Sequence, residues 1–231
     1  MNSKQFVEKL AQDNEALFRA SEMNVEAYFA SNPSKEALVE HFVGRMVNER
    51  MNMVEISNKV ATAPANMPAE ELALLSKQAL DEANHFRMVK EVIEHITGET
   101  LDVESAIAHE SAKPTAKGAT LLAKYEAESD PLALAAYQFI AEGRAERVWH
   151  KMAECIQDEF ISTTYAKIAR DEGFHSNIGR RSLELLATDA ESQARVEQIA
   201  RTMRMDLFAI SCMNTTSVPA AQKLVNDAYG A

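Results

Sequence analysis

One short motif occurs twice in this chain and restricts its fold more than any other feature of the sequence. Asp81-Glu82-Ala83-Asn84-His85 and Asp171-Glu172-Gly173-Phe174-His175 both have the pattern Asp-Glu-x-x-His, and their glutamates lie 90 residues apart (172 − 82). Residues three apart lie on one face of an α-helix, so each Glu points in the same direction as its His. Each motif can therefore direct one carboxylate and one imidazole into a protein interior.

Helix start and stop signals surround both motifs. Asn32-Pro33, Pro68 and Asp130-Pro131 mark helix beginnings because Pro fits the first helical position, and Gly98 fits the residue after a helix end. From these signals we predict helices at 3–30 (as one or two), 33–62, 68–97, 131–156, 158–187 and 188–213, short pieces around 102–110 and 118–128, and a last helix from residue 219.

The composition favours an all-α fold. Strong helix formers are abundant, whereas the 231 residues include only seven Gly and six Pro. Two long helix pairs joined by a long crossover are typical of a ferritin-like four-helix bundle. We therefore predict a single all-α domain over 1–231, with its core bundle at about 34–187 and extra helices at 3–30 and 188–230.

The height of each helix position along the bundle selects further acidic residues. A bundle that holds two metal ions needs both Glu-x-x-His pairs and one Glu from each of the other two helices. Glu49 lies 14 residues before the predicted loop at 63–67 (63 − 49), and Glu82 lies 15 residues after it (82 − 67). At about 1.5 Å per residue, both lie about 21–22 Å from the turn. Glu55 lies about two turns away from this level.

The second helix pair gives the same result. Glu142 and Glu172 each lie 15 residues from a predicted turn near 157. Glu49 and Glu142 also share their helix faces with apolar residues, where carboxylates are rare unless they are paired or bind metal. Glu146, one turn after Glu142, is a weaker alternative. Four carboxylates would balance two divalent cations, and the predicted ligands are Glu49, Glu82, His85, Glu142, Glu172 and His175.

Other residues are predicted to support these ligands. A ligating His usually donates its second ring N–H to a carboxylate, so Asp81 and Asp171 are candidates to accept from the His of the opposite motif. Tyr165 lies two turns before Glu172 and is either a pocket residue near the metals or a core residue. The helix-interior glycines provide either close helix contact or space for a substrate, and the second interpretation predicts a cavity near these residues: Gly143, Gly173 and Gly179.

Taken together, the ligand positions resemble the ferritin-like dimetal-carboxylate superfamily over roughly residues 34–187. Asp-Glu-Ala-x-His at 81–85, the pair Glu142-Gly143 and the ending Phe174-His175 are also similar to the catalytic subunit of phenylacetyl-CoA epoxidase, over a short stretch. The resemblance implies that the six ligands hold two Fe ions, with Mn/Fe or Mn as alternatives, and that the site reacts with O₂ or peroxide.

This resemblance leads to an expected function and to alternatives. The leading expectation is a diiron oxygenase or oxidase that oxidises a small organic substrate with O₂ and an electron donor. A ferroxidase or a peroxide-scavenging protein like ferritins and rubrerythrins is the second, although the chain lacks the Cys-x-x-Cys pair of a rubredoxin iron site. A metal-free bundle that serves as a binding or assembly subunit is the third.

Charge and composition exclude several partners. The net charge of −11 argues against binding a phosphate backbone, so we expect no nucleic-acid partner. No stretch approaches the roughly 18 consecutive apolar residues that span a bilayer, so we expect no membrane partner. Cys155 and Cys212 cannot form a disulfide framework, and a reduced cytoplasmic location fits. A homodimer is compatible with the sequence.

Overall fold

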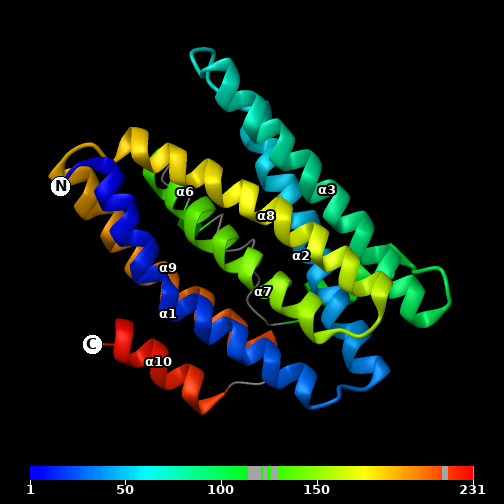
Figure 1. Ribbon diagram of the computed structural model, residues 1–231. Coiled ribbons are helices and arrows are strands. Elements are labelled where there is room, and N and C mark those ends of the chain that lie inside the picture. The colour runs from blue at the N-terminus through cyan, green and yellow to red at the C-terminus, as the bar shows by residue number, and fades with distance from the viewer. Residues whose placement is uncertain (114–120, 122–123, 126–129, 215–217, 231) are drawn as a thin grey trace. The chain divides into compact units, whose positions relative to one another are not determined.

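The computed structural model describes residues 1–231 except for 114–120, 122–123, 126–129, 215–217 and 231 (Figure 1). Every regular element within the described residues is a helix, so the predicted all-α class is confirmed. The predicted helical piece around 118–128 lies largely outside the described residues. The elements are α1 (Ser3–Ala30), α2 (Lys35–Ala61), α3 (Ala69–Thr97), α4 (Val103–Ser111), α6 (Pro131–Tyr137), the π-helical turn η1 (Gln138–Glu142), α7 (Gly143–Cys155), α8 (Glu159–Leu186), α9 (Ala190–Asn214) and α10 (Pro219–Tyr229).

Internal contacts divide the chain into two compact units. Unit 1 comprises residues 1–32 and 120–231, and unit 2 comprises residues 33–119. Each unit contains one of the two Asp-Glu-x-x-His motifs, and each is described by itself below. No helix among the described residues is long and apolar enough to cross a membrane.

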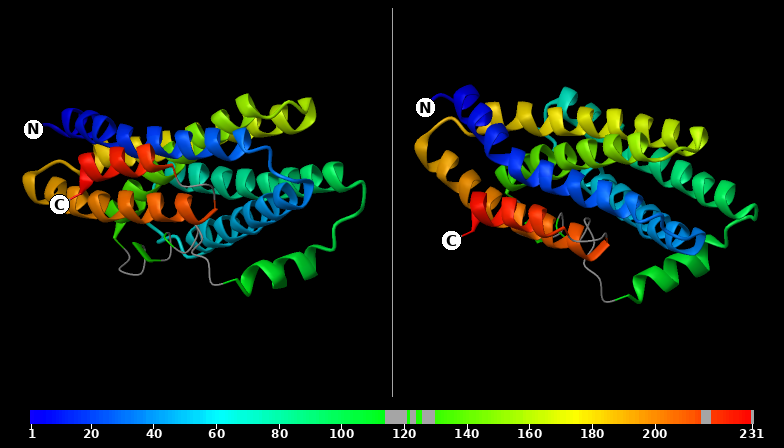
Figure 2. Two further views of the ribbon diagram at one scale, coloured as in Figure 1. Left: turned by 90° about the horizontal axis from the view of Figure 1, so that it is seen from below. Right: turned by 60° about the horizontal axis from the view of Figure 1, so that its bottom comes forward.

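Unit 2 is built on a hairpin of α2 and α3, against which α4 packs through α2 (Figures 1 and 2). The Ser34 side chain accepts a hydrogen bond from the Ala37 backbone N–H at 3.2 Å and caps the beginning of α2. Gly98 follows α3 with a φ of +76°, a left-handed conformation that Gly adopts without the usual steric cost. The hairpin turn lies between Ala61 and Ala69, close to the predicted loop.

Unit 1 is built on a second hairpin, in which α6, η1 and α7 follow one another and α8 returns alongside them. Asp158 caps α8 by accepting from the Ile161 N–H at 3.0 Å. The helix α1 packs against α7, and α9 and α10 lie beside α1 (Figure 2). These three helices fall within the ranges predicted as extra helices, 3–30 and 188–230.

A π-helical turn interrupts the helix that was predicted to run without a break over 131–156. It spans Gln138–Glu142, and the Ser176 hydroxyl of α8 donates a hydrogen bond to the Phe139 carbonyl at 3.1 Å. A carbonyl at an irregular turn needs such a partner when it is buried. The interaction therefore couples the turn to α8.

Gly179 of α8 lies directly against this segment. A Cβ atom at position 179 would lie 2.3 Å from the Phe139 N atom and 2.7 Å from the Ala135 carbonyl oxygen. The predicted substrate space at Gly179 is therefore wrong, because backbone atoms of α6 and η1 fill it. At Gly143 a Cβ would meet Ser176 and Phe18 at 3.0 and 3.2 Å, so close helix contact explains this glycine too.

Candidate metal sites

Unit 2 brings together a group of two carboxylates and one imidazole. Glu49 comes from the middle of α2, and Glu82 and His85 come from one face of α3; all three are buried. His85 Nδ1 lies 3.7 Å from Glu49 Oε2 and 3.9 Å from Glu82 Oε2. Two donor atoms bonded to one metal ion at about 2.0–2.2 Å are at most about 4.4 Å apart. These separations therefore fit donors that share one ion.

Arg45 also contacts this group. One turn before Glu49 on α2, it donates a hydrogen bond from Nη2 to Glu49 Oε1 at 2.7 Å. Burial raises the pKa of Glu49, but the positive charges of Arg45 and His85 lower it by a larger amount. The pKa therefore falls to about 2. The second oxygen, Oε2, is buried and accepts no hydrogen bond from the described residues. Glu49 thus has a charged oxygen that faces His85 and can bind a cation.

Unit 1 contains a second group of the same composition. Glu142 lies at the end of the π-helical turn, and Glu172 and His175 share a face of α8; all three are buried. His175 Nδ1 lies 3.0 Å from Glu172 Oε2, and ligand atoms of the three residues lie within 4.8 Å of one another. Single π-helical turns occur often at functional sites, where they reorient a side chain. Here the turn ends at the Glu of the group.

The two groups, which we call the Glu49 triad (Glu49, Glu82, His85) and the Glu142 triad (Glu142, Glu172, His175), are chemically alike. Each offers two carboxylates and the Nδ1 atom of one imidazole, and two carboxylates neutralise one divalent cation. Ionised carboxylates that are buried without a counter-charge are costly. Buried carboxylate and imidazole groups of this kind can hold a metal ion. Whether the six predicted ligands do so stays a prediction.

The aspartates that precede the two motif glutamates have partners on their own helices. The Lys77 ammonium pairs with Asp81 on α3, and Lys167 Nζ lies 2.7 Å from Asp171 Oδ2 on α8. The repeated pattern is therefore longer than the motif itself, namely Lys-x-x-x-Asp-Glu-x-x-His. Such i,i+4 pairs between partly exposed side chains stabilise their helix by about 0.2–0.5 kcal/mol each. The expected hydrogen bond that each Asp would accept from the opposite His stays a prediction.

Tyr165 and Glu146 are the remaining candidates from unit 1. Tyr165 is buried and packs its ring against Trp149, with ring centroids 5.7 Å apart, which is how a core residue behaves. Glu146 occupies the space left by Gly173, where a Cβ would lie 2.8 Å from Glu146 Oε1. Burial and the Glu172 charge raise the pKa of Glu146. Glu146 therefore stays an alternative ligand, and roles for Tyr165 near a metal stay a prediction.

Several features of these sites were missed from the sequence, although three residues among them carried a signal. Arg45 lies at the i−4 position of Glu49 and so shares its face, and the two lysines recur at the same offset in both motifs. The π-helical turn has no comparable signal, because its residues are ordinary helix formers.

Comparisons with known proteins identify the fold. No protein-family model matches the chain, and no curated protein sequence matches it. Among solved structures, the crystal structure of a TenA homolog from Pseudomonas syringae pv. tomato is similar to this chain, with a TM-score of 0.64 and 12% sequence identity. The match covers 90% of this chain and 91% of that protein.

This match overturns the expected membership of the ferritin-like dimetal-carboxylate superfamily and the weaker likeness to the epoxidase subunit. Both relied on short ligand spacings, and an antiparallel helical hairpin can present such spacings in many all-α folds. The expected diiron oxygenase or oxidase function relied on that membership and is wrong by the same finding. The ferroxidase and peroxide-scavenging alternatives relied on the same membership and are withdrawn with it. The metal-free binding or assembly subunit, an alternative from another class, is withdrawn as well. The chain has a TenA-like helical fold.

Proposed function

We propose that this chain is a metalloenzyme that binds one divalent transition-metal ion through each triad. The observation that carries the proposal is the duplication: each unit has a buried Glu/Glu/His triad on a helical hairpin, with the same ring nitrogen toward the carboxylates. A single buried contact between a His and a carboxylate is explained by a hydrogen bond that stabilises the fold, without any metal ion. Two copies with matching donor sets favour a ligand of opposite charge.

The donor set favours iron or manganese. Carboxylates suit Mn²⁺ and Mg²⁺, imidazole suits Fe²⁺ and Zn²⁺, and a set with both but without thiolate lies between these preferences. Three protein donors also leave coordination positions for water or a substrate. A bound ion would supply Lewis acidity and, for iron or manganese, redox chemistry.

The residues of this chain would bind and orient that ion in a buried site. Carboxylates and imidazole provide the bonds, and Arg45 keeps Glu49 ionised. Lys77 and Lys167 form ion pairs with the neighbouring aspartates. A small molecule is the substrate class that we propose. A cytoplasmic location is the setting that we propose with it.

Metal binding by purified protein tests the proposal. Chelator-treated protein is titrated with Fe²⁺ without oxygen and with Mn²⁺ followed by electron paramagnetic resonance. We expect two ions to bind at micromolar or lower concentration, and Glu82→Gln and Glu172→Gln each to lose at least tenfold in affinity at one of the two sites, because each replaces a charged donor with a neutral amide. Glu55→Gln is the matched control, since Glu55 is a half-buried glutamate of α2 outside both triads.

The metal-free variants separate ligation from packing. Gln has the shape of Glu and removes a buried negative charge, so metal-free Glu82→Gln should be as stable as wild-type protein or more stable. A wild-type protein that binds neither ion would disprove the proposal. Variants that bind both ions as the wild type does would show that the triads are not the sites.

A further inference from the structure

Unit 1 has a groove that residues of α1, α9 and α10 line, and none of these residues belongs to the Glu142 triad. Its volume is about 570 Å³, which suits a small molecule. Charged side chains from α1 and α9 and the Tyr229 ring of α10 line it. The groove therefore combines residues from three helices that lie side by side (Figures 1 and 2).

Arg204 is the unusual residue of this groove. Only 6% of its surface is exposed, although it carries a permanent positive charge. Its Nε donates to Asn14 Oδ1 at 2.8 Å, and its guanidinium lies 5.3 Å from the centre of the Tyr229 ring. Both contacts are to neutral groups, and the buried Nη2 atom has no hydrogen-bond partner among the described residues. A buried cation with neutral partners only is costly.

The acids of the groove do not balance this charge. Asp13 and Glu197 both line it, and both bind Lys9, whose Nζ lies 2.7 Å from Asp13 and 3.0 Å from Glu197. Arg201, one turn before Arg204 on α9, forms no ion pair with any residue that the structure describes. The groove thus has three positive charges, from Lys9, Arg201 and Arg204, and only two carboxylates, both of which already pair with Lys9.

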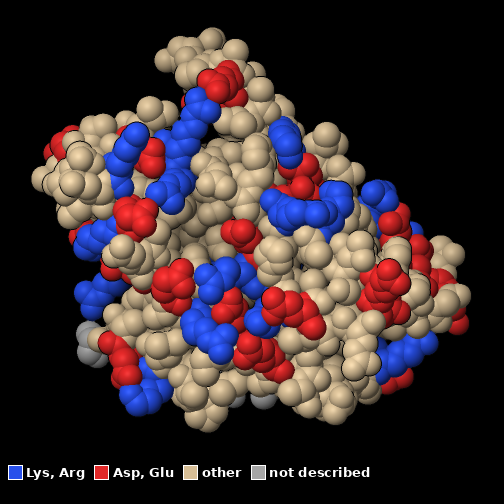
Figure 3. All heavy atoms as spheres, in the orientation of Figure 1, with Lys and Arg blue, Asp and Glu red and all other residues tan. Residues whose placement is uncertain are grey.

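This local excess of positive charge contrasts with the acidic character of the whole chain. The net charge is −11, and acidic and basic side chains alternate over the face shown in Figure 3. Guanidinium groups present N–H donors in a planar fork that matches the oxygens of carboxylates and phosphates. A bound oxyanion would supply both the missing charge and the missing acceptors.

We propose that this groove binds a small organic anion through its phosphate or carboxylate group, with Arg204 and Arg201 as the anchoring residues. The proposal is independent of the metal sites, because none of its residues belongs to either triad. It rests on the burial and hydrogen bonding of Arg204 and on the ion pairs that Asp13 and Glu197 form with Lys9.

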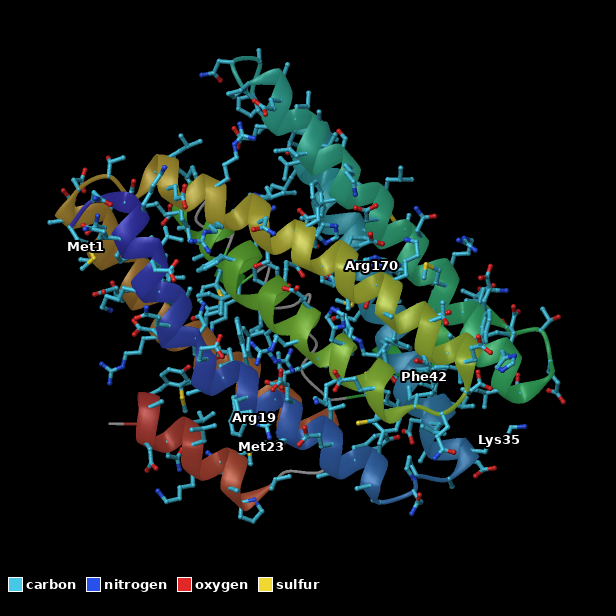
Figure 4. The ribbon with its side chains drawn as sticks, in the orientation of Figure 1. Met1, Arg19, Met23, Lys35, Phe42 and Arg170 are labelled. Carbon is cyan, nitrogen blue, oxygen red and sulfur yellow. The ribbon has the colours of Figure 1, made fainter. Side chains whose placement is uncertain are left out.

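Calorimetric titration of the full chain with two probes tests this inference. The probes are inorganic phosphate and citrate, each compared with chloride at equal ionic strength. We expect wild-type protein to bind at least one probe, and Arg201→Gln to bind it at least fivefold more weakly. Arg204→Met, which keeps much of the side-chain volume, should lose at least tenfold. Arg170→Gln is the matched control, because Arg170 is an exposed arginine of α8 (Figure 4).

The two probes distinguish the sources of the anion. Binding of phosphate alone supports a phosphoryl ligand, and binding of citrate alone supports a carboxylate ligand. Arg201 is exposed, so Arg201→Gln stays informative even if Arg204→Met fails to fold. The inference is overturned if neither probe binds more tightly than chloride, or if both groove variants bind like the Arg170→Gln control.

Discussion

Glu22 on α1 illustrates how a single charged residue is kept inside unit 1. It is buried, yet Arg147 Nε donates to its Oε1 at 2.5 Å and Arg19 Nη1 donates to its Oε2 at 3.2 Å. Burial raises the pKa of Glu22, but the hydrogen bonds and charges of the two arginines lower it more, so the net pKa lies below its ordinary value of 4.5. The folded protein thus favours the ionised form.

The pH dependence of stability follows from that direction. A carboxylate whose pKa is lowered on folding stabilises the protein above the unfolded pKa, and the contribution is lost as pH falls through the folded pKa. Glu22→Gln should therefore be about 1–2 kcal/mol less stable than wild type at pH 7. The difference should shrink as pH falls below about 4.5. Urea denaturation at pH 7, 5 and 4 measures it, with the exposed Glu71→Gln as control. A difference that grows toward acid pH would contradict the ion-pair explanation.

At the scale of helices, we expect substitution by Ala to change the stability in opposite directions at Gly179 and at Gly44. Gly179→Ala would push a methyl group into the Phe139 and Ala135 backbone, which cannot move aside as a side chain can. We expect a loss of about 2–3 kcal/mol. Gly44→Ala would meet only the Glu110 carboxylate at 3.4 Å, so the helix preference for Ala should give a gain of up to about 1 kcal/mol.

Thermal and urea denaturation of the two variants give both values. Each glycine lies inside a long helix, so differences in helix propensity cancel in the comparison. Equal stability of the two variants would show that α8 does not approach α6 and η1 as closely as the structure has it.

Helix bounds and hairpin turns could be predicted from the sequence because local chemistry determines them. Side-chain caps and first-turn prolines mark where helices begin, as Asp130 and Pro131 do for α6. The start of α2 was predicted two residues too early, at Pro33, because the Ser34 side chain caps that helix. The height of Glu49 relative to the Glu82 pair followed from counting residues on each arm of a hairpin. The π-helical turn could not be predicted, because it depends on packing and hydrogen bonding with α8, which is distant in sequence.

At the scale of the whole molecule, family and function depend on how the hairpins connect to the other helices. The ligand spacing is a property of one hairpin and carries no information on that connection. The sequence therefore predicted candidate residues in each hairpin but assigned the wrong superfamily, and only the fold comparison corrected it. The Arg204 groove escaped the sequence analysis for a related reason, since its residues come from α1, α9 and α10.

Metal binding should also raise the stability of the folded chain. A ligand that binds only the folded state adds RT ln(1 + [L]/Kd), about 2.7 kcal/mol at a hundredfold excess over Kd. For a chain of this size we expect a rise in Tm of about 5–10 °C with Fe²⁺ or Mn²⁺. The rise should be smaller in Glu82→Gln, which alters one of the two triads, and should vanish in the double variant Glu82→Gln/Glu172→Gln and at acid pH, where protonated ligands cannot bind metal. Differential scanning calorimetry measures it, and superimposable curves at neutral pH would contradict metal binding.

The π-helical turn has a consequence for how relatives of this chain can be recognised. A π-turn holds one residue more than the α-helical turn it replaces, and one residue corresponds to a rotation of about 100° along a helix. Val148, Trp149 and Met152 on α7 are buried, and their orientation depends on that extra residue. A homologue without it would align to this chain only with a gap placed inside a continuous helix. Superposition of the two backbones would therefore detect a relationship that an ungapped sequence alignment misses.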